Sequence, residues 1–110
     1  MQKRNDLKVI WSPLSLGDVH DIGDFLVQVV ASEKAERIVD DVLRAGDLLG
    51  EFPSMSRMRD DIYPGLRLAL VRPYVVCYFL KGDMVRIARV LHGKQDVVAA
   101  FSQDPLSPFL

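Results

Sequence analysis

The chain has 110 residues, which fits one domain large enough to bury a hydrophobic core. Hydrophobic residues make up 49% of it, which argues against disorder across the whole chain. The net charge of −1 excludes a generally polyanion-binding protein. However, residues 1–55 carry 6 basic and 10 acidic residues, whereas residues 56–110 carry 8 and 5. This asymmetry indicates either a charged partner for one half or an unevenly charged, solvated surface.

The N-terminal half predicts one strand followed by two helices. Residues 7–11 are strand-like, and Ser12 followed by Pro13 is typical of a helix N-cap with proline at the first helical position. Apolar residues at three- and four-residue spacing then predict a helix over residues 13–30. A second apolar stripe follows Ser32, which we expect to cap a second helix that closes before Gly50 and Pro53. A short turn between the two helices makes them an αα-hairpin.

The polar face of the first helix carries three aspartates one turn apart, Asp18, Asp21 and Asp24, with no lysine or arginine. Paired carboxylates can bind metals or transfer protons, but on a solvent-facing side we interpret them as solvated. His20 lies among them in sequence and is too isolated to be assigned as a ligand. Elsewhere the chain has no metal-ligand cluster, glycine-rich phosphate loop or nucleophile motif, so we expect no metal and no cofactor.

The C-terminal half predicts a sheet. Residues 66–93 contain three runs rich in β-branched residues, separated by turn signals at Arg72–Pro73 and around Gly82. The preceding loop, residues 50–65, could extend into the first of these strands at Ile62–Tyr63. The order is therefore β-α-α-β-β-β, an α+β fold in which the helical hairpin packs on one face of an antiparallel sheet. We expect one domain over residues 1–101 and an irregular tail over residues 102–110.

The sequence leaves two alternatives for the second face of this sheet. Strand alternation puts Val85, Ile87, Arg89 and Leu91 on one side of the last strand and Arg86, Ala88, Val90 and His92 on the other. The helices can cover only one side. The other side would then be an apolar patch flanked by arginines and open to a partner, unless residues 94–110 fold back over it.

The groups that could converge on the sheet are mostly basic, and we predict that they bind a partner: Arg67, Arg72, Arg86, Arg89, His92 and Lys94. A less favoured alternative is RNA cleavage, in which Arg67 and Arg89 hold the phosphate and His92 transfers protons. Cys77, the only cysteine, lies in a predicted strand, so we expect a buried, inert thiol. No leader segment or membrane-length apolar run is seen, and the expected location is a reducing cytoplasm.

The element order and several stretches resemble the toxins of the RelE/ParE superfamily of bacterial type II toxin–antitoxin systems. These stretches are VIWSPLSLGDVHDI (9–22), GLR (65–67), PYVVCYF (73–79) and IARVLHGKQD (87–96). The resemblance spans about residues 8–101, and its last stretch looks like the ParE-type ending of the family. The middle loop lacks a lysine pair and no tyrosine follows His92, which departs from the RelE pattern and favours the ParE branch.

The resemblance implies a small toxin that is neutralised by a cognate, DNA-binding, ParD-like antitoxin in a hetero-oligomer. ParE-like members inhibit DNA gyrase and have no known nuclease activity, whereas RelE-like members cut mRNA on the ribosome. We therefore expect a gyrase inhibitor that is not an enzyme and does not itself bind specific nucleic-acid sequences. A ribosome-dependent mRNA endonuclease is the alternative, and a fold that retains only antitoxin binding is a third possibility.

Overall fold

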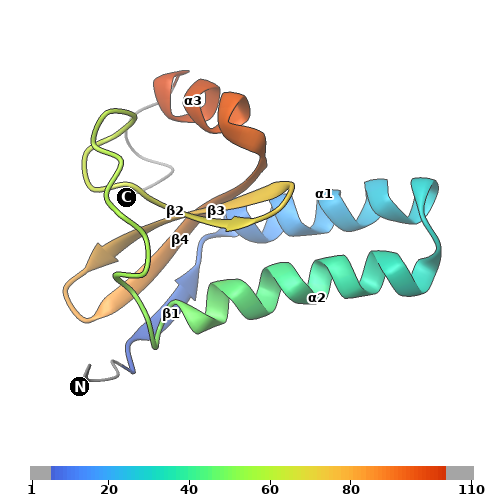
Figure 1. The fold of residues 1–110 in the computed structure, drawn as a ribbon, viewed down its shortest axis with the longest axis horizontal. Helices are drawn as coiled ribbons and strands as arrows, with labels where there is room; N and C mark the ends of the chain where they lie inside the picture. Colours follow the sequence, from blue (N-terminus) through green and yellow to red (C-terminus); the bar gives the residue numbers. More distant parts are fainter. Residues whose placement is uncertain (1–5, 104–110) are drawn as a thin grey trace.

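The computed structural model describes residues 6–103 as a four-stranded sheet with three helices (Figure 1). The elements are β1 (Lys8–Trp11), α1 (Pro13–Val29), α2 (Ser32–Leu48), β2 (Arg67–Val71), β3 (Tyr74–Lys81), β4 (Met84–His92) and α3 (Gly93–Gln103). The strand order is β1-β4-β3-β2. The predicted α+β order is confirmed, with one difference in the sheet: β1 pairs parallel with β4, while the other pairs are antiparallel.

The helix termini follow local capping chemistry. The Ser15 backbone N–H donates to Ser12 Oγ at 3.0 Å, and Pro13 opens α1, as predicted. At α2 the prediction was wrong by one residue. Ala31 is the N-cap residue, Ser32 already lies in the helix, and no side chain caps this end.

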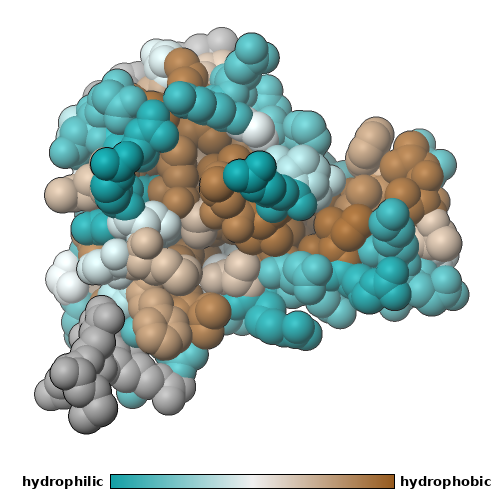
Figure 2. Space-filling model, in the orientation of Figure 1, coloured by the Kyte–Doolittle hydropathy of each residue, from teal (hydrophilic) through white to brown (hydrophobic). Residues whose placement is uncertain are grey.

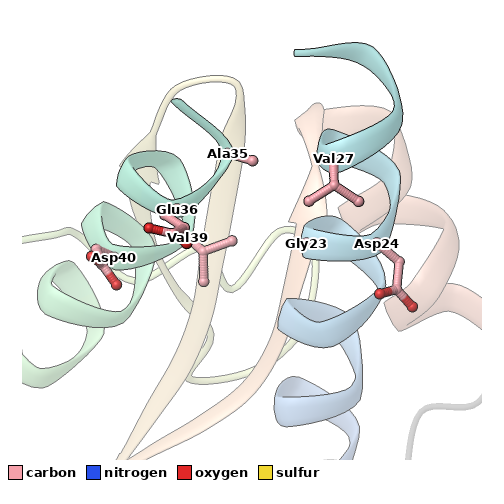
Figure 3. Close-up of a pocket in the computed structure, with 7 residues that line it drawn as sticks. All are labelled: Gly23, Asp24, Val27, Ala35, Glu36, Val39 and Asp40. Carbon is pink, nitrogen blue, oxygen red and sulfur yellow. The ribbon is translucent and has the colours of Figure 1, made fainter. Parts of the chain in front are cut away.

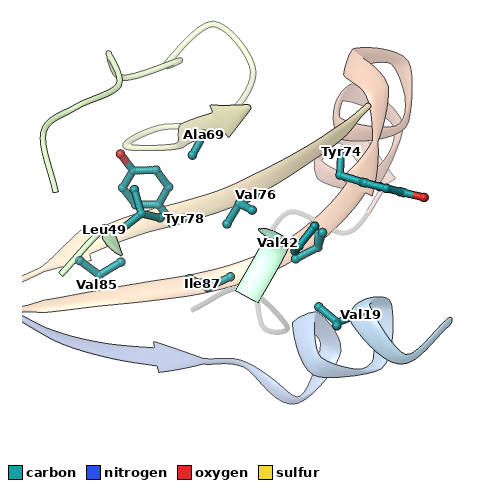
Figure 4. Close-up of a cluster of buried hydrophobic side chains, with 10 residues drawn as sticks. Val19, Val42, Leu49, Ala69, Tyr74, Val76, Tyr78, Val85 and Ile87 are labelled. Carbon is teal, nitrogen blue, oxygen red and sulfur yellow. The ribbon is translucent and has the colours of Figure 1, made fainter. Parts of the chain in front are cut away.

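The helical hairpin covers one face of the sheet and forms the larger core. Figure 4 shows Val76, Tyr78, Val85 and Ile87 of the sheet gathered with Val42 of α2 and Val19 of α1. Tyr78 is fully buried, and its hydroxyl donates to the Pro53 carbonyl at 3.0 Å. This bond satisfies the one polar group that the ring brings into the core.

The chain itself covers the second face of the sheet over β3 and β4, which corrects the expectation that this whole face awaits a partner. Val97 and Phe101 of α3 are buried against Val75, Cys77 and Phe79. The edge of Phe101 also meets Tyr63 of the preceding loop, at a ring-centroid distance of 5.7 Å. The alternative, in which the segment after β4 folds back, is therefore correct for residues 93–103. It buries apolar rings that would otherwise face water.

A β-bulge in β4 corrects the predicted side-chain alternation. Cys77 pairs with Arg89 but Tyr78 pairs with Ile87, so Ala88 is an extra residue on β4. Beyond the bulge the faces switch: Val90 joins Val85 and Ile87 under the helical hairpin, and Leu91 joins the core beneath α3. Period-two counting from the sequence could not register this insertion.

The loop between α2 and β2 is ordered around the edge of the sheet. β2 begins at Arg67, so the predicted extension of this strand at Ile62–Tyr63 is wrong. Ile62 and Tyr63 pack instead into the core beneath α3. At the C-terminus, α3 continues through Gln103, so residues 102 and 103 are helical rather than part of an irregular tail. The rest of that predicted tail, including Phe109–Leu110, lies outside the described residues.

In the part of the chain that the structure describes, no helix combines the length and apolar character that crossing a bilayer requires.

Candidate functional site

The outer edge of the sheet carries a groove with an apolar floor and a basic rim, which we call the β2 groove. It consists of two adjoining hollows of about 410 and 390 Å³ that share part of their lining. Its principal residues come from the 50–65 loop, from β2 and its turn, and from the start of α3: Arg57, Arg59, Leu68, Leu70, Arg72 and Lys94. Leu70 is 62% exposed, so apolar surface remains uncovered at this edge.

The strand under this groove has a free edge. β2 is the last strand in the order β1-β4-β3-β2, and on its outer side Met58 forms an isolated bridge with Arg67. Among residues 6–103, no backbone partner lies outside β2 beyond that bridge. An edge with unpaired backbone groups is able to accept an added strand from another chain.

The positive charge of the β2 groove is only partly neutralised. Arg59 donates to both oxygens of Asp61, at 3.0 and 2.9 Å, and this pairing raises the pKa of Arg59 and lowers that of Asp61. Arg57, Arg72 and Lys94 are exposed and have no ion-pair partner among the described residues. The groove therefore favours a ligand that brings carboxylates along with apolar side chains.

Two of the six predicted partner-binding residues, Arg72 and Lys94, meet in this groove. Arg67 lies at the start of β2, where its guanidinium donates to the Ser56 carbonyl beside the groove. Arg86 lies on β4 opposite Phe79 and next to Ile10 of β1, away from the groove.

Arg89 is held inside the fold by Asp18 of α1. Its Nε and Nη2 donate to the two carboxylate oxygens at 2.7 and 2.8 Å, and the pair raises the pKa of Arg89. The Val90 N–H also donates to Asp18, at 2.9 Å. The Asp18 and Arg89 side chains are only 14% and 23% exposed, so the prediction that Asp18 is solvated was wrong. Any partner contact with Arg89 would have to compete with this pair.

Beyond the end of β1, Ser12 and Asp18 make the hydrogen bonds to β4 that a longer β1 would have made. After Trp11 the chain turns away from β4, and the Ser12 N–H donates to the Ile87 carbonyl at 2.9 Å while Ser12 Oγ donates to the Ala88 carbonyl at 2.8 Å. Asp18 then accepts from the Val90 N–H, one step further along β4. The edge groups of β4 are thereby satisfied by the first turns of the hairpin.

The three residues of the nuclease alternative do not converge. Arg67 pairs with Tyr78 across β2 and β3, whereas His92 pairs with Tyr74 and packs edge-on against its ring. Tyr74 and Tyr78 are four residues apart, roughly 13 Å along a strand. Arg89 is occupied by Asp18. The geometry thus separates the groups that would have to act on one phosphate.

On α1, His20 Nδ1 lies 3.4 Å from Asp24 and 3.8 Å from Asp21, with all three side chains exposed to solvent. His20 and Asp24 lie one helical turn apart, which brings their side chains together, and Asp21 directly follows His20 in the chain. Asp21 and Asp24 are thus exposed, as expected.

Sequence reasoning missed much of the β2 groove. Arg57 and Arg59 were visible only as arginines in a long loop, and no pattern indicated that the loop would run beside β2. Leu68 and Leu70 read as ordinary strand residues, because the strand order that places β2 at the edge depends on long-range pairing. An alternating apolar pattern does not distinguish an edge strand from a central one.

Known proteins of similar sequence show which family this chain belongs to. A family model described as "ParE toxin of type II toxin-antitoxin system, parDE" matches residues 9–97. The chain belongs to this family of toxins. Among curated relatives, Toxin ParE3 of Caulobacter vibrioides is 43% identical over 51 residues, which cover 46% of this chain and 51% of that protein. The chain thus spans about half the length of that relative. Toxin RelE2 of the same bacterium is 29% identical over 86 residues, covering 78% and 94%.

Solved structures show the same fold. A chain from the chromosomal ParDE toxin–antitoxin system of P. aeruginosa superposes with a TM-score of 0.72 at 24% identity, covering 81% of this chain and 98% of that one. A chain from the RelBE2 toxin–antitoxin complex of Mycobacterium tuberculosis gives 0.57 at 20% identity, covering 84% and 97%. This ParE family member therefore shares its architecture with both branches of the superfamily.

Proposed function

We propose that this ParE family toxin inhibits DNA gyrase and is neutralised by a cognate, ParD-like, DNA-binding antitoxin in the bacterial cytoplasm. The family match over residues 9–97 is the observation that carries the proposal. The separation of Arg67, Arg89 and His92 supports a toxin that acts by binding, without covalent chemistry of its own.

The β2 groove is the proposed docking site for the antitoxin. An extended antitoxin segment would add a strand to the free edge of β2, place apolar side chains near Leu68 and Leu70, and bring carboxylates to Arg57, Arg72 and Lys94. Backbone pairing supplies affinity in this mode, and the charged rim supplies selectivity for an acidic segment.

The experiment for the target is controlled expression of the chain in bacteria, followed by assays with purified gyrase. We expect filamentous cells, a DNA-damage response and loss of supercoiling activity, all prevented when the antitoxin is co-expressed. Rapid arrest of translation with cleaved messages would overturn the gyrase proposal. It would instead favour the RelE-like alternative, to which the similarity with Toxin RelE2 gives specific support.

The experiment for the docking site uses two matched charge reversals. The groove variant carries Arg57→Glu, Arg72→Glu and Lys94→Glu, and the control carries Lys34→Glu, Arg37→Glu and Arg44→Glu on the exposed side of α2. We expect the groove variant to bind the antitoxin at least tenfold more weakly, because each contact with a carboxylate becomes a repulsion. Equal losses in both variants would contradict the assignment of the site.

A further inference from the structure

A second groove lies between the distal halves of α1 and α2, on a part of the molecule that the β2 groove does not reach. Gly23 and Val27 of α1 face Ala35 and Val39 of α2 across a cavity of about 310 Å³ (Figure 3). Val27 and Val39 point toward each other across the gap between the helices. Gly23 has no side chain there, which leaves the groove open on the α1 side. We call this the hairpin groove.

This groove lies on a part of the hairpin that projects beyond the sheet, as Figure 1 shows. Among the described residues, no strand lies beneath the distal ends in this view. Val27, which lines the groove, is 58% exposed. Phe25 and Val29 are also exposed but lie outside the groove lining, whereas Leu26 and Ala35 are buried. In Figure 2 the projecting end carries a cluster of hydrophobic side chains bordered by hydrophilic ones. An apolar cluster of this kind on a small protein is typical of an interaction surface.

The rim of the hairpin groove is acidic, in contrast to the basic rim of the β2 groove. Asp24 borders it on α1, and Glu36 and Asp40 border it on α2, all three being exposed (Figure 3). The surrounding hairpin, residues 13–48, carries 8 acidic and 3 basic residues, and none of the described residues that line the groove is basic. The local field therefore attracts cations and repels a carboxylate-rich segment.

We propose that the hairpin groove docks a basic amphipathic helix of a partner protein, with its apolar side chains between α1 and α2 and its lysines or arginines on the acidic rim. The apolar floor and acidic rim match such a helix, which would lie as a third helix along the pair. An acidic segment suited to the β2 groove would be repelled here, so the two grooves select different segments. This inference does not depend on the identity of the toxin's target.

The test uses the purified chain and two fluorescent probe peptides of about 18 residues with the same leucine pattern, one with lysines and one with glutamates on its polar face. Fluorescence anisotropy measures their affinities. We expect the lysine peptide to bind and the glutamate peptide to bind at least tenfold more weakly, with the difference shrinking at high salt because screening weakens the rim.

Two sets of carboxylate-to-amide substitutions locate the binding. The rim variant carries Asp24→Asn, Glu36→Gln and Asp40→Asn; the control carries Asp21→Asn, Glu33→Gln and Asp41→Asn, which lie on the same hairpin outside the groove lining. Both variants have the same net charge, so general attraction of a cationic peptide changes equally. We expect the rim variant to lose at least tenfold in affinity and the control less than threefold.

A third variant, Gly23→Leu, tests the apolar floor without changing charge. An added Cβ at Gly23 would lie 3.7 Å from Val39, which is ordinary contact, so the longer side chain extends into the groove. We expect loss of lysine-peptide binding with an unchanged circular-dichroism spectrum. Equal binding of both peptides, or equal losses in the rim and control variants, would overturn the proposal. A dimer of the unmodified chain that Gly23→Leu dissociates, seen by sedimentation, would overturn it in favour of a second copy as the occupant.

Discussion

The two halves of the helical hairpin are built from the same helices but differ in how their side chains are packed. In the half nearest the sheet, Asp18 binds Arg89, Val42 is buried in the core, and Gly46 allows α2 to approach Trp11 and Ile87. In the distal half, Val27 is exposed and Gly23 faces a groove.

This difference teaches that the apolar stripe of a helix does not by itself decide what is buried. Apolar residues continue along α1 to Val29, past the point where the sheet can cover them (Figure 1). The proximal half is therefore expected to determine stability, and the distal half is free to bind other molecules at little structural cost. Substitutions made in matched pairs, one in each half, test this division.

Removing the carboxylate of Asp18 should have the largest effect. Asp18→Ala leaves the guanidinium of Arg89 and the N–H of Val90 without their acceptor, in a region where both side chains of the pair are largely buried. We expect a loss of about 2–3 kcal/mol in the free energy of unfolding, measured by urea denaturation.

The matched substitution is Asp24→Ala in the distal half, which should change stability by less than about 0.5 kcal/mol. The double variant Asp18→Ala/Arg89→Ala should cost less than the sum of its single variants, because it leaves no unpaired guanidinium. Equal effects of Asp18→Ala and Asp24→Ala would show that the pair with Arg89 contributes nothing to folding.

Adding one methyl group to Gly46 in the proximal half or to Gly23 in the distal half should have opposite effects on stability. A Cβ at Gly46 would overlap the Trp11 ring and lie 3.0 Å from Ile87, so Gly46→Ala should cost about 1–3 kcal/mol through overpacking. At Gly23 an added Cβ would make an ordinary contact with Val39 at 3.7 Å and the backbone is helical, so Gly23→Ala should stabilise by up to about 1 kcal/mol. Thermal unfolding of both variants checks the sign, and a stabilised Gly46→Ala would be incompatible with close packing at Trp11.

The elements that follow local rules could be predicted from the sequence. The cap at Ser12, the start of α1 at Pro13 and the buried position of Cys77 were all predicted correctly, because each depends on neighbouring residues or on a continuous apolar run. The features that depend on distant contacts could not. The bulge at Ala88 changes the side-chain alternation only through its pairing with β3, and no periodic pattern records it.

The candidate site was less predictable than the fold, for the same reason. Arginines are equally suited to bind a partner or a carboxylate of their own chain, and Asp18 lies 71 positions from Arg89 in the sequence. Arg72 and Lys94 were among the predicted partner-binding residues, and that role stays a prediction, although the structure places both in the β2 groove. The acidic groove near Gly23 and Val39 was not predicted, because the aspartates of α1 were treated as a uniform solvated face.

The pH dependence of the free energy of unfolding should show whether the Cys77 thiol is shielded from water. Burial raises the pKa of the Cys77 thiol, so the folded chain keeps this proton when the unfolded chain releases it, above about pH 8.5. The unfolded state then binds fewer protons, and stability falls as pH rises, by up to about 1.4 kcal/mol per pH unit from this group. Urea denaturation between about pH 7.5 and 9.5 should show a steeper fall for the unmodified chain than for Cys77→Ala. Identical slopes would indicate that the thiol is accessible to water.

Thiol labelling should separate the two halves of the hairpin without large changes in stability. Val27→Cys places a thiol at a position that is 58% exposed, whereas Val42→Cys places one where only 1% is exposed. With an excess of a coloured disulfide reagent, Val27→Cys should release one equivalent rapidly, while Val42→Cys and the native Cys77 should react only as the chain unfolds. Addition of the lysine-bearing peptide should slow labelling of Val27→Cys, because the peptide is expected to occupy the hairpin groove. Slow labelling at Val27→Cys in the absence of peptide would mean that the distal half is covered, and the contrast between the halves would then disappear.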